Sequence, residues 1–129
     1  KLDTNSGTSQ EYSIIFRLEE QYLIRAEARI HLGKLAEAKN DINKIRQRAT
    51  LANTTANTSE ELSQAVLQER RVELFTEFGH RWFDLKRTGK TGTVLSVIKP
   101  AWKDRDNLLP LPASELLANS HLLPQNQGY

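Results

Sequence analysis

Apolar residues recur at helical spacing on both sides of Gly33, and this pattern constrains the fold more than any other feature of the sequence. Between residues 14 and 32 the apolar residues that recur at helical spacing include Ile15, Leu18, Tyr22, Ala26 and Ile30. A second set follows Lys34 and contains Ala36, Ala38, Ile42, Ile45 and Ala49. Gly33 stands where a C-cap glycine would end the first helix. The very short connection predicts that the two helices form an antiparallel hairpin.

A third helix is expected to begin after Thr58, which can cap it with Glu61 as its capping-box partner. The Thr/Asn-rich residues 51–57 before it have no periodicity and predict a loop. The apolar stripe of this helix contains Leu67, Leu74, Phe75, Phe78, Trp82 and Leu85. Gly79 lies inside the stripe, which leaves open whether the helix bends or breaks there.

After Arg87 the glycines and prolines are too closely spaced for another long helix. Residues 94–98 are expected to form a strand-like run, and Ser114 is a candidate cap for a short last helix. The predicted fold class is all-α: a tetratricopeptide-like helical hairpin, a long third helix and an extended, loop-rich C-terminal segment. We expect residues 1–13 to be a loop or linker and residues 14–129 to be one helical domain.

The hairpin resembles a single tetratricopeptide unit. Its small residues lie around Ala26 and Ala38, where they would let two helices approach closely. One such unit cannot bury a continuous core by itself. Either the third helix or further sequence must therefore cover it.

The charge and composition exclude several classes of function. The net charge of +2 arises from 18 basic and 16 acidic residues, so no large field of one sign exists to attract nucleic acid. The absence of Cys excludes disulfides and thiolate metal ligands within these residues. His31, His80 and His121 lack the spacing of metal ligands. We therefore predict no metal, no cofactor and no nucleic-acid partner.

One charged constellation lies on the third helix, where Arg71 falls inside the apolar stripe and Arg81 borders it. A buried guanidinium requires a carboxylate partner. Glu20 and Glu27 are candidates, because their seven-residue separation places them on one face of the first helix. We favour a structural ion-pair network of these four residues over an arginine clamp for an anionic ligand, since no glycine-rich phosphate cradle accompanies them.

Carboxylate pairs such as Glu73/Glu77 and Glu19/Glu20 have a spacing that is usual for a solvated or ion-paired helix surface. A glycosidase needs two carboxylates, so these pairs could in principle serve one. Because their spacing is that of a helix surface, we predict no catalytic residue. Trp102 lies in an irregular segment, where an aromatic ring can stack on a sugar or tuck under the chain. It is the candidate ligand-binding residue.

Three blocks of motifs follow one another along the chain. The first comprises residues 17–28, RLEEQYLIRAEA, with its hairpin mate at residues 43–49, NKIRQRA. The second comprises residues 68–74, QERRVEL, and residues 78–87, FGHRWFDLKR. The third comprises residues 108–116, LLPLPASEL, and residues 123–129, LPQNQGY. In this order the blocks resemble those of the SusD/RagB family, which implies that Tyr129 would be the natural end of the protein. The departures from the family pattern are Glu19, Arg25, Phe78 and Gln127.

The resemblance implies that residues 14–129 are the C-terminal helical domain of a longer, surface-exposed lipoprotein of the outer membrane, whose lipidated Cys is not in this chain. Such proteins capture glycans or other nutrients without catalysis and pass them to a SusC-like TonB-dependent transporter. The implied ligand of the full-length protein is an oligosaccharide or another nutrient, and this piece would be mainly scaffold. The alternative is a tetratricopeptide-like adaptor that binds a protein partner.

Overall fold

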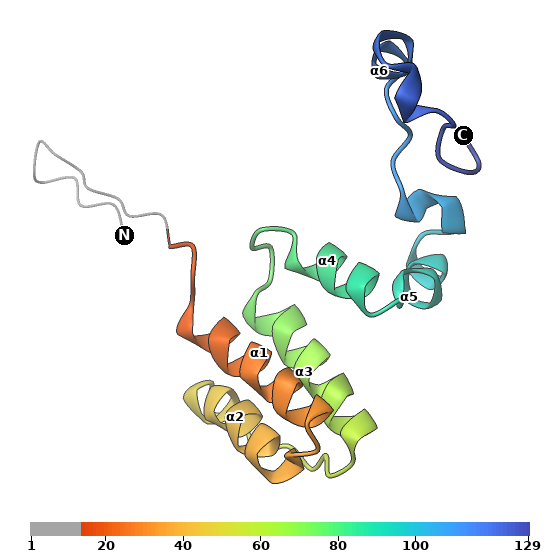
Figure 1. Cartoon of the computed structure of the whole chain (residues 1–129). Coiled ribbons are helices and arrows are strands. Elements are labelled where there is room, and N and C mark those ends of the chain that lie inside the picture. The colour runs from red at the N-terminus through yellow and green to blue at the C-terminus, as the bar shows by residue number, and fades with distance from the viewer. Residues whose placement is uncertain (1–13) are drawn as a thin grey trace, which may run out of the picture. The chain divides into compact units, whose positions relative to one another are not determined.

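The computed structural model describes residues 14–129, which form helices joined by turns, with no strand among them (Figure 1). The predicted all-α fold class is therefore confirmed for this part of the chain. The chain divides into two compact units, Lys1–Phe75 and Thr76–Tyr129. The predicted loop or linker at residues 1–13 lies outside the described residues. Within residues 14–129 no helix is both long and apolar enough to cross a bilayer.

The first unit begins with a hairpin of α1 (Leu18–His31) and α2 (Leu35–Arg48), as predicted. Gly33 joins the two helices with a φ of +72°, a left-handed conformation that glycine adopts without steric cost. The backbone N–H of Lys34 donates to the carbonyl of Arg29 at 2.8 Å and closes the end of α1. The first helix begins later than expected, at Leu18, because residues 14–17 are not helical.

The helix α3 (Ser59–Glu73) contacts both helices of the hairpin (Figure 1). The predicted capping box is confirmed: Thr58 Oγ1 accepts from the N–H of Glu61 at 3.2 Å, and Glu61 Oε2 accepts from the N–H of Thr58 at 3.1 Å. Apolar side chains from all three helices form the core of this unit: Leu23, Ala26, Ile30, Ala38, Ile42, Ile45, Leu62 and Val66. Because this core is small, we expect polar contacts between the helices to contribute to its stability.

The third helix ends at Glu73, so the expected long stripe is divided between α3 and α4 (His80–Arg87). Thr76, Phe78 and Gly79 have positive φ angles of 62°, 40° and 73°. A left-handed backbone cannot continue a right-handed helix, and the chain therefore breaks here instead of bending. Of the two outcomes left open at Gly79, the break is the one observed, and the long third helix expected from the sequence is two shorter helices.

The second unit contains α4, α5 (Thr91–Ile98), a 3₁₀ helix (Asp104–Asn107), α6 (Ala113–Ala118) and a second 3₁₀ helix (Ser120–Leu122). The predicted strand-like run at residues 94–98 is wrong, because it forms part of α5. A short apolar run does not distinguish a strand from a helix by its periodicity. The predicted cap at Ser114 is also wrong: the N-cap of α6 is Pro112, whose φ of −58° already suits a helix start.

Candidate functional site

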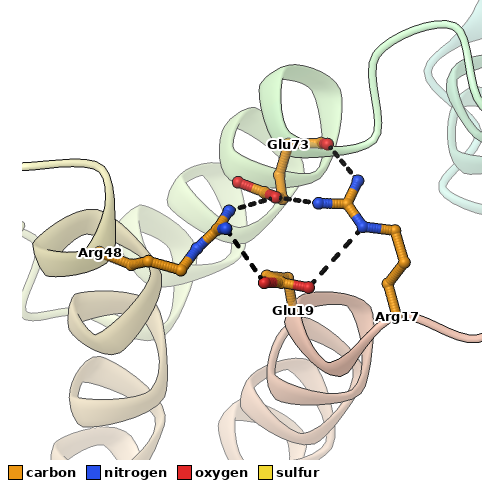
Figure 2. A network of polar contacts seen from close by, with 4 residues as sticks. All are labelled: Arg17, Glu19, Arg48 and Glu73. Carbon is orange, nitrogen blue, oxygen red and sulfur yellow. Dashed lines mark hydrogen bonds and ion pairs between the residues drawn. The ribbon is translucent and has the colours of Figure 1, made fainter. Parts of the chain in front are cut away.

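Two arginines and two glutamates form a closed ring of ion pairs that joins the three helices of the first unit (Figure 2). Arg17 is the N-cap of α1, and Glu19 lies in the first turn of that helix. Arg48 is the last residue of α2, and Glu73 is the last residue of α3. The ring therefore gathers one end of each helix.

Glu73 accepts most of the hydrogen bonds in this ring. Its Oε1 lies 2.5 Å from Nη2 of Arg17 and 2.6 Å from Nη2 of Arg48. Nη1 of Arg17 also donates to the main-chain carbonyl of Glu73 at 3.0 Å, one of the carbonyls that a helix end leaves without an intrahelical partner. Glu19 completes the ring, 3.2 Å from Nη1 of Arg48 and 3.7 Å from Nε of Arg17.

Among the charged residues that the structure describes in this unit, Asp41 of α2 is the most deeply buried, with 1% of its surface exposed. Arg25 forms a bidentate contact with this carboxylate: Nε donates to Oδ2 at 3.0 Å and Nη2 donates to Oδ1 at 2.7 Å. Nη1 of Arg29 also donates to Oδ2, at 2.5 Å. Burial alone would raise the pKa of this carboxyl. Hydrogen bonds from Arg25 and Arg29 and their positive charges outweigh burial and hold the pKa of Asp41 below its ordinary value.

The buried arginine of α3 is Arg70 and not Arg71. Arg70 is 6% exposed, and its Nη2 lies 3.8 Å from Oε1 of Glu20, one of the two candidate carboxylates. Arg71 is exposed, so its predicted burial is wrong. The reason is geometric: the buried face of α3 contains Leu62, Val66, Glu69 and Arg70, and Arg71 lies about 100° further around the helix.

Of the other two members of the predicted network, Glu27 is half-buried on α1 and Arg81 is exposed on α4, in the second unit, and their part in such a network stays a prediction. A further pair that the sequence did not suggest joins Arg46 Nη1 to Glu69 Oε1 at 2.5 Å. The missed signal was position: Asp41 and Glu69 stand on the apolar faces of α2 and α3, where a carboxylate requires a cation.

Trp102 is half-buried beside Trp82 in the second unit. The two rings meet edge to face, with centroids 6.1 Å apart and an interplanar angle of 72°. Nζ of Lys86 lies 5.4 Å from the centroid of Trp82. The indole Nε1 of Trp102 is buried and has no acceptor among the described residues.

The last residues of the chain are held by side-chain amides. Gln125 forms two hydrogen bonds with the backbone of Leu111: its Oε1 accepts from the N–H at 2.7 Å, and its Nε2 donates to the carbonyl at 2.9 Å. Nδ2 of Asn126 donates to the carbonyl of Leu109 at 2.7 Å. Arg105 donates to the carbonyl of Gly128 and lies 5.0 Å from the ring centroid of Tyr129.

Within residues 14–129 no three His, Cys, Asp or Glu side chains gather as a metal site would require. Glu19 and Glu73, which belong to the acid pairs considered for glycoside hydrolysis, both face Arg17 and Arg48. The arrangement that the structure describes in the first unit is thus one of structural ion pairs between helices.

The family model of the SusD family matches residues 1–129. A SusD-like protein P2 of Formosa agariphila is 38% identical, over 97% of this chain and 27% of its own length. The starch-binding protein SusD of Bacteroides thetaiotaomicron is 32% identical, over 89% of this chain and 21% of its own length. This chain therefore spans about a quarter of the length of the curated relatives that it matches.

Solved structures of similar chains have the same fold. The crystal structure of a SusD-like protein from Bacteroides fragilis aligns with a TM-score of 0.74 and 31% identity, over 90% of this chain and 26% of the other. The crystal structure of a SusD superfamily protein from Bacteroides vulgatus aligns with a TM-score of 0.77 and 29% identity, over 88% and 27%.

Proposed function

This chain belongs to the SusD family, and from that membership we propose that it is part of a non-catalytic nutrient-binding protein in which these residues act mainly as helical scaffold. The observation that carries the proposal is the family match along all 129 residues. Nutrient binding occurs in this family, as the starch-binding relative illustrates. We propose an oligosaccharide as the ligand of the full-length protein.

The scaffold role is supported by the way the charges of the first unit are used. Asp41 binds Arg25 and Arg29, while Glu73 binds Arg17 and Arg48. These guanidinium groups join one helix to another inside the unit. Such pairs specify the packing of helices and suit a rigid support better than a binding surface.

Family membership also supports a location and a partner. We propose that the full-length protein is a surface-exposed lipoprotein of the outer membrane, with its lipidated Cys outside this chain. Its proposed partner is a SusC-like TonB-dependent transporter. Fractionation of membranes followed by co-purification of the transporter with the tagged protein tests both proposals, and recovery in the soluble fraction alone would contradict them.

Trp102 remains our proposed ligand contact within this chain. Its half-exposed ring can stack on a sugar, and the neighbouring Trp82 would support the ring from the side. We expect Trp102→Ala to weaken glycan binding by the full-length protein. Arg71→Ala is the matched control, because Arg71 is an exposed residue of the first unit.

The binding and the lack of catalysis can be tested together. Native gels cast with soluble starch, xylan or laminarin should retard the full-length protein in at least one polysaccharide. The same mixtures should release no reducing sugar over a day. Steady release that disappears in Glu77→Gln would overturn the non-catalytic assignment, and unretarded migration in all the gels would count against a glycan ligand.

A further inference from the structure

The end of the chain encloses a polar pocket in the second unit. Its volume of about 450 Å³ lies within the usual range for small-molecule sites. Two segments line the pocket, one around the first 3₁₀ helix and one at the last turn of the chain: Asp104, Arg105, Asn107, Leu108, Gln127 and Gly128. These lining residues do not include Trp102, so the pocket is a different place from the ligand contact proposed above.

Contacts between the two segments hold the walls of this pocket in place. Nη1 of Arg105 donates to the carbonyl of Gly128, and the hydroxyl of Tyr129 donates to the carbonyl of Leu108 at 3.0 Å. Gly128 has a φ of +95°, and a Cβ at this position would lie 2.9 Å from Cδ of Arg105. Only glycine therefore lets the arginine side chain pack against the last turn. A pocket with fixed walls loses little conformational entropy when a ligand binds.

Two side chains of the pocket have unused hydrogen-bonding groups. Within residues 14–129 the carboxylate of Asp104 and the amide of Gln127 have no hydrogen-bond or ion-pair partner, and both side chains are exposed. A carboxylate accepts hydrogen bonds, whereas an amide both donates and accepts them. Gln127 is also one of the departures from the family pattern, so its amide is a feature of this chain.

The charges of the pocket favour an uncharged ligand. The guanidinium group of Arg105 is already engaged, because it donates to Gly128 and its Nε lies 3.8 Å from Oδ1 of Asp106. The carboxylate of Asp104 has no such cation and would repel an anionic ligand. Hydroxyl groups both donate and accept, so a ring with neighbouring hydroxyls can bind a carboxylate and an amide together. Tyr129, 46% exposed, adds an aromatic surface beside them.

We propose that this pocket binds one neutral sugar unit, whose hydroxyl groups donate to the carboxylate of Asp104 and form hydrogen bonds with the amide of Gln127. The inference rests on the proposed function, because it assigns a second contact for the proposed oligosaccharide ligand. It adds a preference for uncharged over acidic sugars.

Hydrogen exchange of the full-length protein, followed by peptide mass spectrometry, locates the site. The probes are three uncharged trisaccharides, maltotriose, xylotriose and laminaritriose, with trigalacturonate as the acidic comparison. We expect at least one uncharged trisaccharide to slow exchange several-fold in the peptides that contain residues 104–108 and 126–129. Trigalacturonate should leave exchange in these peptides unchanged, because its carboxylates meet that of Asp104.

Two variants test the proposed contacts by calorimetry with the trisaccharide that binds. Gln127→Ala removes an exposed amide without a partner, so the fold should persist while the affinity falls about 5- to 10-fold, as expected for the loss of one hydrogen bond. Asp104→Asn should also weaken binding and should reduce the discrimination against trigalacturonate. Ser120→Ala, at an exposed position of the second 3₁₀ helix, is the matched control and should leave the affinity unchanged.

The outcomes separate this inference from the proposed function. Trisaccharide binding that slows exchange elsewhere in the full-length protein, with residues 104–108 and 126–129 unaffected, would overturn the inference and leave the proposed function standing. An unchanged affinity in Gln127→Ala would have the same meaning. If neither the trisaccharides nor the polysaccharides bind, both the inference and the proposed glycan ligand are wrong.

Discussion

Arg17 donates to both the side-chain carboxylate and the main-chain carbonyl of Glu73, a residue 56 positions away in the sequence. The contact joins the first residue before α1 to the last residue of α3. It therefore holds α3 against the hairpin at the point where the chain leaves the first unit.

We predict that Arg17→Ala destabilises the first unit by about 1–2 kcal/mol, between the values typical of exposed and of buried ion pairs, because both partners are partly exposed. Urea unfolding followed by circular dichroism measures the change. Arg17→Lys should recover only part of the loss, since an ammonium group cannot donate to the carboxylate and the carbonyl with the same planar fork. Full recovery in the lysine variant would show that charge alone matters.

Arg70 and Arg71 are adjacent and should differ sharply. Arg70→Ala should cost about 2–4 kcal/mol, because it removes a buried cation that faces Glu20. Arg71→Ala, at an exposed position, should stay within about 0.5 kcal/mol. Denaturant midpoints of the two variants decide the matter, and a larger loss for Arg71→Ala would restore the original sequence prediction.

Asp41 should make the stability of the first unit depend on pH. Its pKa in the folded protein lies below the ordinary value of 3.8, so the unfolded chain binds the proton more readily. The stabilisation is fully present above about pH 4 and decreases as the pH falls toward the folded pKa. In urea titrations between pH 7 and pH 2.5, Asp41→Asn should show a shallower decrease below pH 4 than the wild type.

A comparison variant keeps this pH test specific. Hydrogen bonds from the backbone of Asn57 and Thr58 lower the pKa of Glu61, so this residue also makes the free energy of unfolding decrease as the pH falls. Glu61→Gln should remove the decrease that is due to Glu61 and leave the decrease that is due to Asp41. If the free energies of unfolding of the wild type and of Asp41→Asn instead fall in parallel below pH 4, the pairing of Asp41 with Arg25 and Arg29 does not make stability depend on pH.

Thr58→Ala should destabilise α3 by about 1 kcal/mol, because it removes the side-chain acceptor for the N–H of Glu61. Thr58→Ser keeps that oxygen and should remain within a few tenths of a kcal/mol of the wild type. Thermal unfolding of both variants provides the measurement. Equal losses in the two would assign the effect to the methyl group of threonine.

Local signals predicted the hairpin and the start of α3 correctly. Gly33 and the Thr58/Glu61 pair act on the backbone within a few residues, so their effect can be inferred from the sequence alone. The break after Glu73 was only partly predictable. Gly79 indicated an interruption, but the positive φ angles of Thr76 and Phe78 are unusual for these residue types and have no local signal.

The ion pairs were harder to predict because they join positions far apart in the chain. The sequence left open whether Glu20 or Glu27 would meet an arginine of the third helix, and it placed Arg71 on the buried face instead of Arg70, because the assumed stripe continued past the real end of the helix. The pairing of Asp41 was not predicted, because Arg25 and Arg29 lie on the preceding helix and reach Asp41 only once the hairpin has formed.

The side-chain amide of Gln125 accepts a hydrogen bond from the N–H of Leu111 and donates one to its carbonyl. A residue of a neighbouring β-strand would make the same two bonds with its backbone. A backbone strand shares its pairing among successive residues, whereas this contact depends on one amide group. Gln125→Glu would keep the volume but place an anionic oxygen against the carbonyl of Leu111. Hydrogen exchange at the Leu111 amide would then accelerate, which would show that the pairing at Leu111 depends on this one side chain.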